Sequence, residues 1–177
     1  MSDIRSNIRL VGLASLQFAN VRSTGSFPAT AASFSTIGNV MPGSAHFVVE
    51  VPDVTDLFVE EEDTPDIQLF GPSKKFIEFA VRDMGTKTLI AAFGGAAVTT
   101  VYSFPVTSTI YREQAVKAVS KVINGKSLTF KIPRASIATG GDLRFARNES
   151  GQITFACNVL MPNSSTAISP CTITQTT

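Results

Sequence analysis

With 177 residues, of which 44% are hydrophobic and 16% charged, the chain is long enough and apolar enough to fold as one domain with its own core, which excludes a disordered chain. Thirteen Phe, two Tyr and no Trp supply packing surface without a polar group, which indicates a core or contacts between subunits. The net charge of +1 divides into an acidic block, Glu50–Asp83, with ten acids and three bases, and a basic block, Arg112–Arg147, with eight bases and two acids.

Residues 1–36 are rich in Ser, Thr, Ala and Gly, and we interpret them as an N-terminal arm with one apolar segment that suits a strand. The first ten residues lack the basic-then-apolar pattern of a signal peptide. The longest largely apolar run, Leu89–Val98, is far shorter than the roughly 20 residues needed to cross a bilayer. We therefore expect a protein that is made and kept in a cytoplasm and has no membrane segment.

The first clear strand signal is Phe47–Val51, where apolar residues alternate and Pro52 ends the run or places it at a sheet edge. The next segment, 57–75, contains four consecutive acids, two prolines and a glycine, so it is too polar for a core strand. A long acidic loop or a projecting hairpin is expected there. Because this segment also carries Leu69 and Phe70, it has apolar surface to bury.

A strand followed by a short helix is predicted for Phe76–Gly95. Apolar residues recur at every second position from Ile77 to Val81, which is the period of a half-buried strand. After Gly85 the chain reads as a helix with a Ser/Thr/Asp-type start and a stop at two glycines.

The strongest hairpin signal is Asn124-Gly125, between a Val-rich run and the alternating segment Leu128–Ile132. The spacing of the Val-rich run would also suit a helix, but the Asn-Gly turn favours a strand. A second turn-and-strand pair is predicted around Gln152–Val159, and residues 163–177 are interpreted as a polar C-terminal tail. The whole chain, 1–177, is therefore predicted to be a single all-β-dominated domain, an antiparallel β-sandwich or barrel with one short helix.

Residues capable of catalysis are scarce. His46 is the single histidine, so neither a zinc site nor a Ser-His-Asp triad has enough partners, and we interpret His46 as an ordinary strand-end residue. The acids Glu60–Asp63 lack the ligand spacing of an EF-hand loop. Cys157 alternates with apolar residues as a small buried hydrophobe would, and a disulfide to Cys171 is possible by count but disfavoured in a reducing compartment. We expect no enzyme activity, cofactor or metal.

The two charged blocks have two interpretations. They are either solvated strand faces that happen to cluster, or complementary surfaces that meet between copies of the chain in a head-to-tail assembly. On the second interpretation, the candidate contact residues combine the acidic loop, its apolar residues and the lysines of the basic block: Glu60, Glu61, Glu62, Asp63, Leu69, Phe70, Lys117, Lys121 and Lys126.

Taken in order, several segments resemble the major tail tube proteins of tailed bacteriophages. They are IGNVMPGSAHFVVEV, the acidic loop, KKFIEFAVRDMGTKTLIAAFGG, the hairpin VINGKSLTFKIPRASI and GQITFACNVLMP. The resemblance is one of pattern and order, and it extends from about Ile37 to Pro162. The most telling part is a strand ending in RDM, followed by a short apolar helix and two glycines.

This resemblance implies an orthogonal β-sandwich flanked by one helix, a fold that the type VI secretion tube protein shares. It also implies a structural virion protein of the viral tail. Six copies would form a ring whose inner strands make a continuous barrel, and stacked rings would form the hollow tube through which double-stranded DNA passes. The helix would be structural, with Leu89, Ile90 and Phe93 shielding sheet surface from water.

The resemblance also implies particular contacts and partners. The long loop, here Leu57–Lys75, would reach the neighbouring ring, and the N-terminal arm or the C-terminal tail would add contacts between subunits. Other partners would be the tape measure, the terminator, the baseplate or tip and, in contractile tails, the sheath. The protein would assemble in the host cytoplasm and reside in the virion tail.

Two other classes compete with this interpretation. One is a different structural virion component, such as a capsid decoration or head-completion protein. The other is a nucleic-acid-binding β-barrel that uses the basic segment Lys117–Arg147. Against the second, the basic strands carry few interleaved aromatic residues, Phe130 and Phe145, and the acidic block would repel phosphate.

Overall fold

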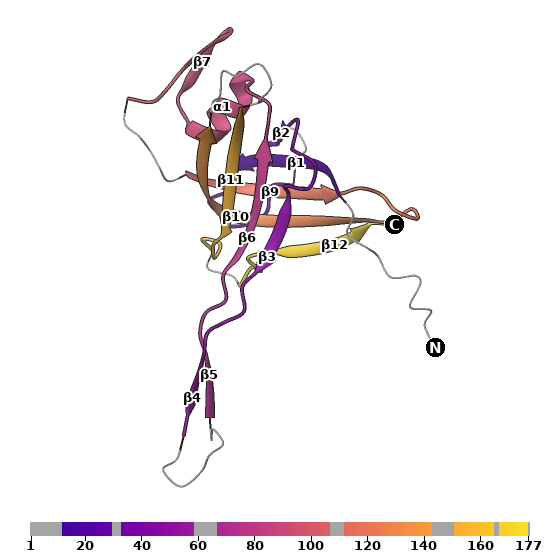
Figure 1. Ribbon diagram of the computed structural model, residues 1–177, viewed down its shortest axis with the longest axis vertical. Helices are drawn as coiled ribbons and strands as arrows, with labels where there is room; N and C mark the ends of the chain where they lie inside the picture. The colour runs from indigo at the N-terminus through magenta and orange to yellow at the C-terminus, as the bar shows by residue number, and fades with distance from the viewer. Residues whose placement is uncertain are drawn as a thin grey trace.

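The computed structural model describes residues 12–29, 33–58, 67–106, 112–142, 151–164 and 167–176 (Figure 1). It confirms the prediction of an all-β fold with one helix. The elements are β1 (Leu13–Asn20), β2 (Ser35–Ile37), β3 (His46–Val49), β4 (Val54–Leu57), β5 (Ile67–Phe70), β6 (Lys75–Val81), α1 (Thr86–Phe93), β7 (Ala96–Val98), β8 (Val101–Ser103), β9 (Arg112–Ser120), β10 (Ser127–Asp142), β11 (Gln152–Val159) and β12 (Thr172–Thr176).

The main sheet is antiparallel and has the strand order β2-β1-β9-β10-β11-β6-β3, with β12 paired to the first part of β10. The long strand β10 belongs to two halves of the sheet, because its first part pairs with β9 and β12 and its second part with β9 and β11. Figure 1 shows that β1, β9 and the first part of β10 run across β11, β6 and β3. The sheet thus folds over itself like an orthogonal sandwich. The barrel alternative is wrong for the described strands, since β2, β3 and β12 each pair with one strand only and leave the sheet open.

The bend in β10 coincides with Pro133. The register between β10 and β9 shifts between Ile132 and Ala135, so Pro133 and Arg134 together face the single residue Ala115. Proline has no N–H to donate, so a bulge is one of the few places where a strand tolerates it. The bulge redirects β10 from one half of the sheet to the other.

The core lies between the two halves. The ring of Phe18 on β1 lies 6.0 Å from that of Phe79 on β6 and 5.9 Å from that of Phe155 on β11, while the last two rings stack at 4.8 Å. The other large side chains that are at most 1% exposed are Leu16, Val81, Val116, Ile132, Ile153 and Cys157. Cys157 is therefore a buried hydrophobe, as predicted, and burial raises the pKa of its thiol far above the ordinary range. Cys157 and Cys171 are both free thiols.

Helix α1 is confirmed, but its beginning differs from the prediction, because the N-cap is Gly85 and has no side-chain cap. It begins after Gly85, and Asp83 accepts hydrogen bonds from the Gly85 N–H at 2.9 Å and from the Thr88 hydroxyl at 3.0 Å. Gly94, at φ 77°, ends it as expected. The fully buried side chains are Thr88 and Ala92. Leu89 and Phe93 are partly buried and pack against the core, as predicted, and Ile90 is partly buried.

The last turn of α1 is held by side chains from the strands. The last carbonyls of a helix lack regular intrahelical partners, and here the Ile90 carbonyl accepts a hydrogen bond from the cap, from the Gly94 N–H at 3.0 Å. The guanidinium of Arg112 donates to two carbonyls of this turn, the Thr139 hydroxyl donates to the Ala92 carbonyl at 2.8 Å, and the Tyr102 hydroxyl donates to the Gly94 carbonyl at 2.8 Å. A cation near a helix C-terminus also complements the helix dipole. Polar contacts therefore fix the helix to the sheet in addition to its apolar face.

The apolar segment expected within residues 1–36 is a strand, and a further strand lies within residues 163–177, for which the sequence predicts a polar tail. β1 lies inside the sheet between β2 and β9, with Leu16 and Phe18 buried. β12 lies within the expected tail and pairs with β10 from Ser127 to Lys131. All five residues of β12 are exposed, so its sequence carries no apolar alternation that could have distinguished it from a tail.

The predicted β9–β10 hairpin is confirmed, and its turn allows a matched test. Gly125 (φ +75°) and Gly140 both have open space where a Cβ would be added, but Gly140 lies within β10 and has no positive φ. We expect Gly125→Ala to lower the free energy of unfolding by about 1 kcal/mol, because an L-residue is strained at this φ. Gly140→Ala should change it by less than about 0.5 kcal/mol. Urea unfolding followed by circular dichroism measures both, and equal effects would contradict the conformational explanation.

Candidate interaction site

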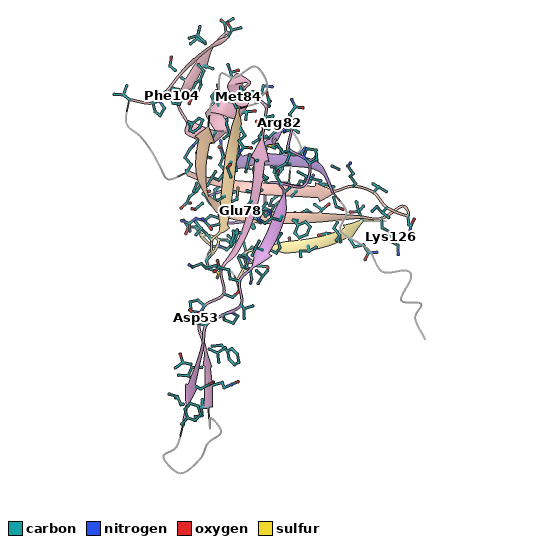
Figure 2. All side chains as sticks on the ribbon, in the orientation of Figure 1. Asp53, Glu78, Arg82, Met84, Phe104 and Lys126 are labelled. Carbon is teal, nitrogen blue, oxygen red and sulfur yellow. The ribbon has the colours of Figure 1, made fainter. Side chains whose placement is uncertain are left out.

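The hairpin β4–β5 projects from the body of the fold (Figures 1 and 2). Residues Val54–Leu57 pair with Ile67–Phe70, and all eight are exposed. At its base the Gly71 N–H donates to the Asp53 carbonyl at 2.7 Å, and the Ser73 hydroxyl donates to the Glu50 carbonyl at 2.6 Å. Of the two forms predicted for this segment, a loop or a projecting hairpin, the structure shows the hairpin.

Apolar side chains dominate the described part of this hairpin. The exposed ones are Val54 (47%), Leu57 (45%), Phe58 (60%), Ile67 (51%), Leu69 (53%) and Phe70 (67%). A hairpin of two strands is marginally stable by itself in water, and contiguous exposed apolar surface marks interaction sites. The predicted contact residues Leu69 and Phe70 belong to this surface. The predicted acids Glu60, Glu61, Glu62 and Asp63 lie outside the described residues.

The three predicted lysines are not gathered in one place. Lys121 and Lys126 flank the turn between β9 and β10, and Figure 2 labels Lys126 at the tip of this turn. Lys117 lies within β9 opposite Lys131 of β10, and their ammonium groups lie over the rings of Phe34 and Phe27 at 5.8 and 5.9 Å. Such contacts are attractive because the face of an aromatic ring is negative.

Two further bases of the basic block are engaged within the subunit. Arg134 donates from Nε and Nη2 to the two carboxylate oxygens of Glu113, at 2.6 and 2.5 Å. Its Nη1 donates to the Met161 carbonyl at 3.1 Å and to the Asn163 Oδ1 at 2.9 Å. Arg112 holds the helix, as described above. Counting charges along the sequence therefore overstated how much of the basic block is available to a partner.

His46 makes contacts that suit a strand-end residue. It lies opposite Glu78 in the β3–β6 register, with its Nε2 3.0 Å from the Glu78 Oε2 and its Nδ1 3.0 Å from the Ser44 carbonyl. Both side chains are well exposed, so this contact contributes little to stability.

An apolar pocket of about 160 Å³ opens beside β3, where the two halves of the sheet face each other. Its walls come from Leu13, Ala45, Phe47, Ala118 and Phe130. The rings of Phe47 and Phe130 lie 5.4 Å apart across the two halves. Because these walls come from widely separated parts of the chain, no local sequence pattern could have revealed the pocket.

A second apolar protrusion lies at the opposite end of the molecule. The β7–β8 hairpin lies beside α1, far from β4–β5, and Phe104 follows it (Figures 1 and 2). Val98, Val101 and Phe104 are 76%, 65% and 62% exposed. The centroids of the Phe104 and Tyr102 rings lie 5.0 Å apart, so part of the Phe104 ring surface packs within its own subunit.

These features define a β-rich protein with apolar protrusions at both ends. Within the described ranges, no three His, Cys, Asp or Glu residues gather in a way that could hold a metal ion. The helix in this part of the chain is too short to cross a membrane. No protein-family model matches the chain, and no curated protein matches it in sequence.

Proposed function

We propose that this protein is the structural subunit of a bacteriophage tail tube. Six copies form a ring, and stacked rings form a hollow tube through which double-stranded DNA passes during genome ejection. The observation that carries this proposal is the projecting β4–β5 hairpin, whose apolar side chains are exposed in the single subunit. A monomeric protein would gain nothing from such a surface, whereas a subunit of an assembly buries it against the next copy.

Three other features support the same proposal. The folded-over sheet with one covering helix is the architecture that the sequence resemblance implies. Among the described strands, β2, β3 and β12 are edges of the main sheet, and free edges pair readily with strands of other chains. The apolar protrusions lie at opposite ends of the molecule, so one subunit presents apolar surface to other copies at both ends.

The hairpin can be tested by making its surface polar. We expect the double substitution Ile67→Ser and Leu69→Ser to leave the free energy of unfolding within about 0.5 kcal/mol of the wild type, because both residues are half exposed. The protein concentration needed for assembly, measured by light scattering, should rise at least about tenfold, because the buried apolar area is lost.

A matched control is Val122→Ser, at the β9–β10 turn, where the side chain is 67% exposed. This variant should assemble like the wild type. Unchanged assembly of the hairpin variant, or an equal loss in both variants, would contradict the proposed role of the hairpin.

A further inference from the structure

We infer that the apolar pocket beside β3 receives the phenyl ring of Phe58 from the β4–β5 hairpin of a second copy. The inference rests on the proposed function, since it names the surface on which the hairpin of one subunit docks. It pairs two features of the subunit for which the fold alone gives no role. One is an open apolar pocket, and the other is a phenylalanine that is 60% exposed.

The size and chemistry of the pocket fit a phenyl ring. Its volume is about 160 Å³. An apolar cavity of roughly 150 Å³ is enough to hold a benzene molecule. Apart from His46, its lining residues carry no ionisable side chain, and the Ser120 hydroxyl already accepts a hydrogen bond from the Leu128 N–H at 2.8 Å. No polar group of the lining therefore needs a polar ligand.

The pocket also has a rim that can orient an incoming hairpin. His46 at the rim is paired with Glu78, and Figure 2 shows Glu78 on the main sheet, away from the projecting hairpin. Among the described strands, β3 pairs only with β6, so an arriving strand could pair with its other side. A hairpin that inserts a ring beside this edge can therefore gain backbone hydrogen bonds as well.

Phe58 is the best placed of the exposed phenylalanines. It follows β4 and lies farther along the projecting hairpin than Phe70, which lies at the base beside Gly71. Phe104 contacts Tyr102 and Phe93 of its own subunit. The hairpin runs away from the body of its own subunit (Figure 1), and Phe58 is not among the residues that line the pocket of the same chain.

A protruding ring and a separate pocket on one molecule make a heterologous contact. Such contacts do not close on themselves in a pair, and they propagate from copy to copy. The same contact repeated around a ring joins one ring to the next, and this is the connection that a stacked tube needs.

A double-mutant cycle in the full-length chain tests the contact. Phe58→Ala removes the ring, and Ala45→Trp fills the pocket from its wall. We expect each substitution to raise the concentration needed for assembly by about tenfold or more, as measured by light scattering. Because both remove the same contact, the double variant should assemble no worse than the poorer single variant. Thermal melts by circular dichroism check that each variant is folded.

The control pair is Phe70→Ala with Ala45→Trp. Phe70 is exposed to a similar extent, on the same hairpin, but is not assigned to the pocket. The factor by which Phe70→Ala raises the concentration needed for assembly should therefore multiply with the factor for Ala45→Trp in the double variant. If the increases in this concentration caused by Phe58→Ala and by Ala45→Trp also multiply, the ring of Phe58 does not occupy the pocket and the inference is overturned.

Cross-linking provides a second test that does not depend on loss of assembly. In a Cys171→Ser background, Phe58→Cys and Ala45→Cys are made in separate chains and treated with a short bis-maleimide. Cys157 is fully buried and does not react. A cross-linked dimer is expected only when the two chains are mixed. Dimers of Phe58→Cys alone would indicate contact between two hairpins and would overturn the inference.

The failure of the inference can be distinguished from failure of the proposed function. If the wild type forms tubes but the mixed cysteine variants give no cross-link, the pocket assignment is wrong and the tube proposal stands. If the wild type remains monomeric at every concentration, both are wrong.

Discussion

Replacing Phe155 by alanine is expected to lower the free energy of unfolding by about 4 kcal/mol, the typical cost of removing a buried phenyl ring. Phe155 is fully buried, and its ring stacks on Phe79 and lies beside Phe18 of the opposite half of the sheet. Its removal leaves a cavity at the point where the two halves meet. Urea unfolding followed by circular dichroism measures the effect.

The control for this prediction is Phe104→Ala, because Phe104 is 62% exposed and packs only at the edge of the fold. It should cost less than about 1 kcal/mol. Comparable losses in the two variants would mean that the contact between the two halves is not the centre of the core.

The second large effect is expected at Arg134. Arg134→Ala removes both hydrogen bonds to Glu113 and those to residues 161 and 163, and it leaves the Glu113 carboxylate without this partner. The two side chains are 21% and 26% exposed. Loss of one partner costs several kcal/mol for a buried pair and little for an exposed pair, so we expect about 2 kcal/mol here.

Arg134→Lys separates charge from geometry. Lysine keeps the positive charge but lacks the planar fork that binds both carboxylate oxygens, so it should recover only part of the loss. Unfolding by urea, for the two variants and for the double variant with Glu113→Ala, gives the coupling between the residues. If the coupling is near zero, the contact with Glu113 contributes nothing to stability and the account of this pair is wrong.

Local patterns predicted the parts of the fold that depend on local chemistry. Asn124-Gly125 predicted the β9–β10 hairpin because two residues with positive φ are required there, and the structure has φ of 52° and 75° at these positions. The helix was predicted from its period and from Gly94. β12 escaped prediction because its pairing with β10 depends on a strand more than thirty residues earlier in the chain, and its side chains face water.

The candidate site, like the fold, could be predicted only where it depends on local sequence. The composition of residues 57–75 indicated a projecting segment with apolar surface to bury, and Leu69 and Phe70 do lie on an exposed hairpin. The pocket could not be predicted, since only the folded topology brings Leu13, Phe47 and Phe130 together. Counting charges wrongly suggested that Arg134 is available to a partner, because the sequence does not show that Glu113 lies on the adjacent strand and pairs with it.

Negative-stain electron microscopy of the purified chain tests the proposed function most directly. At high protein concentration we expect rings with a central channel, and stacks of such rings as hollow tubes. The Ile67→Ser and Leu69→Ser variant should show fewer or shorter stacks at the same concentration. Monodisperse single subunits, with neither rings nor tubes at any protein or salt concentration, would contradict the proposal that this protein forms a tail tube.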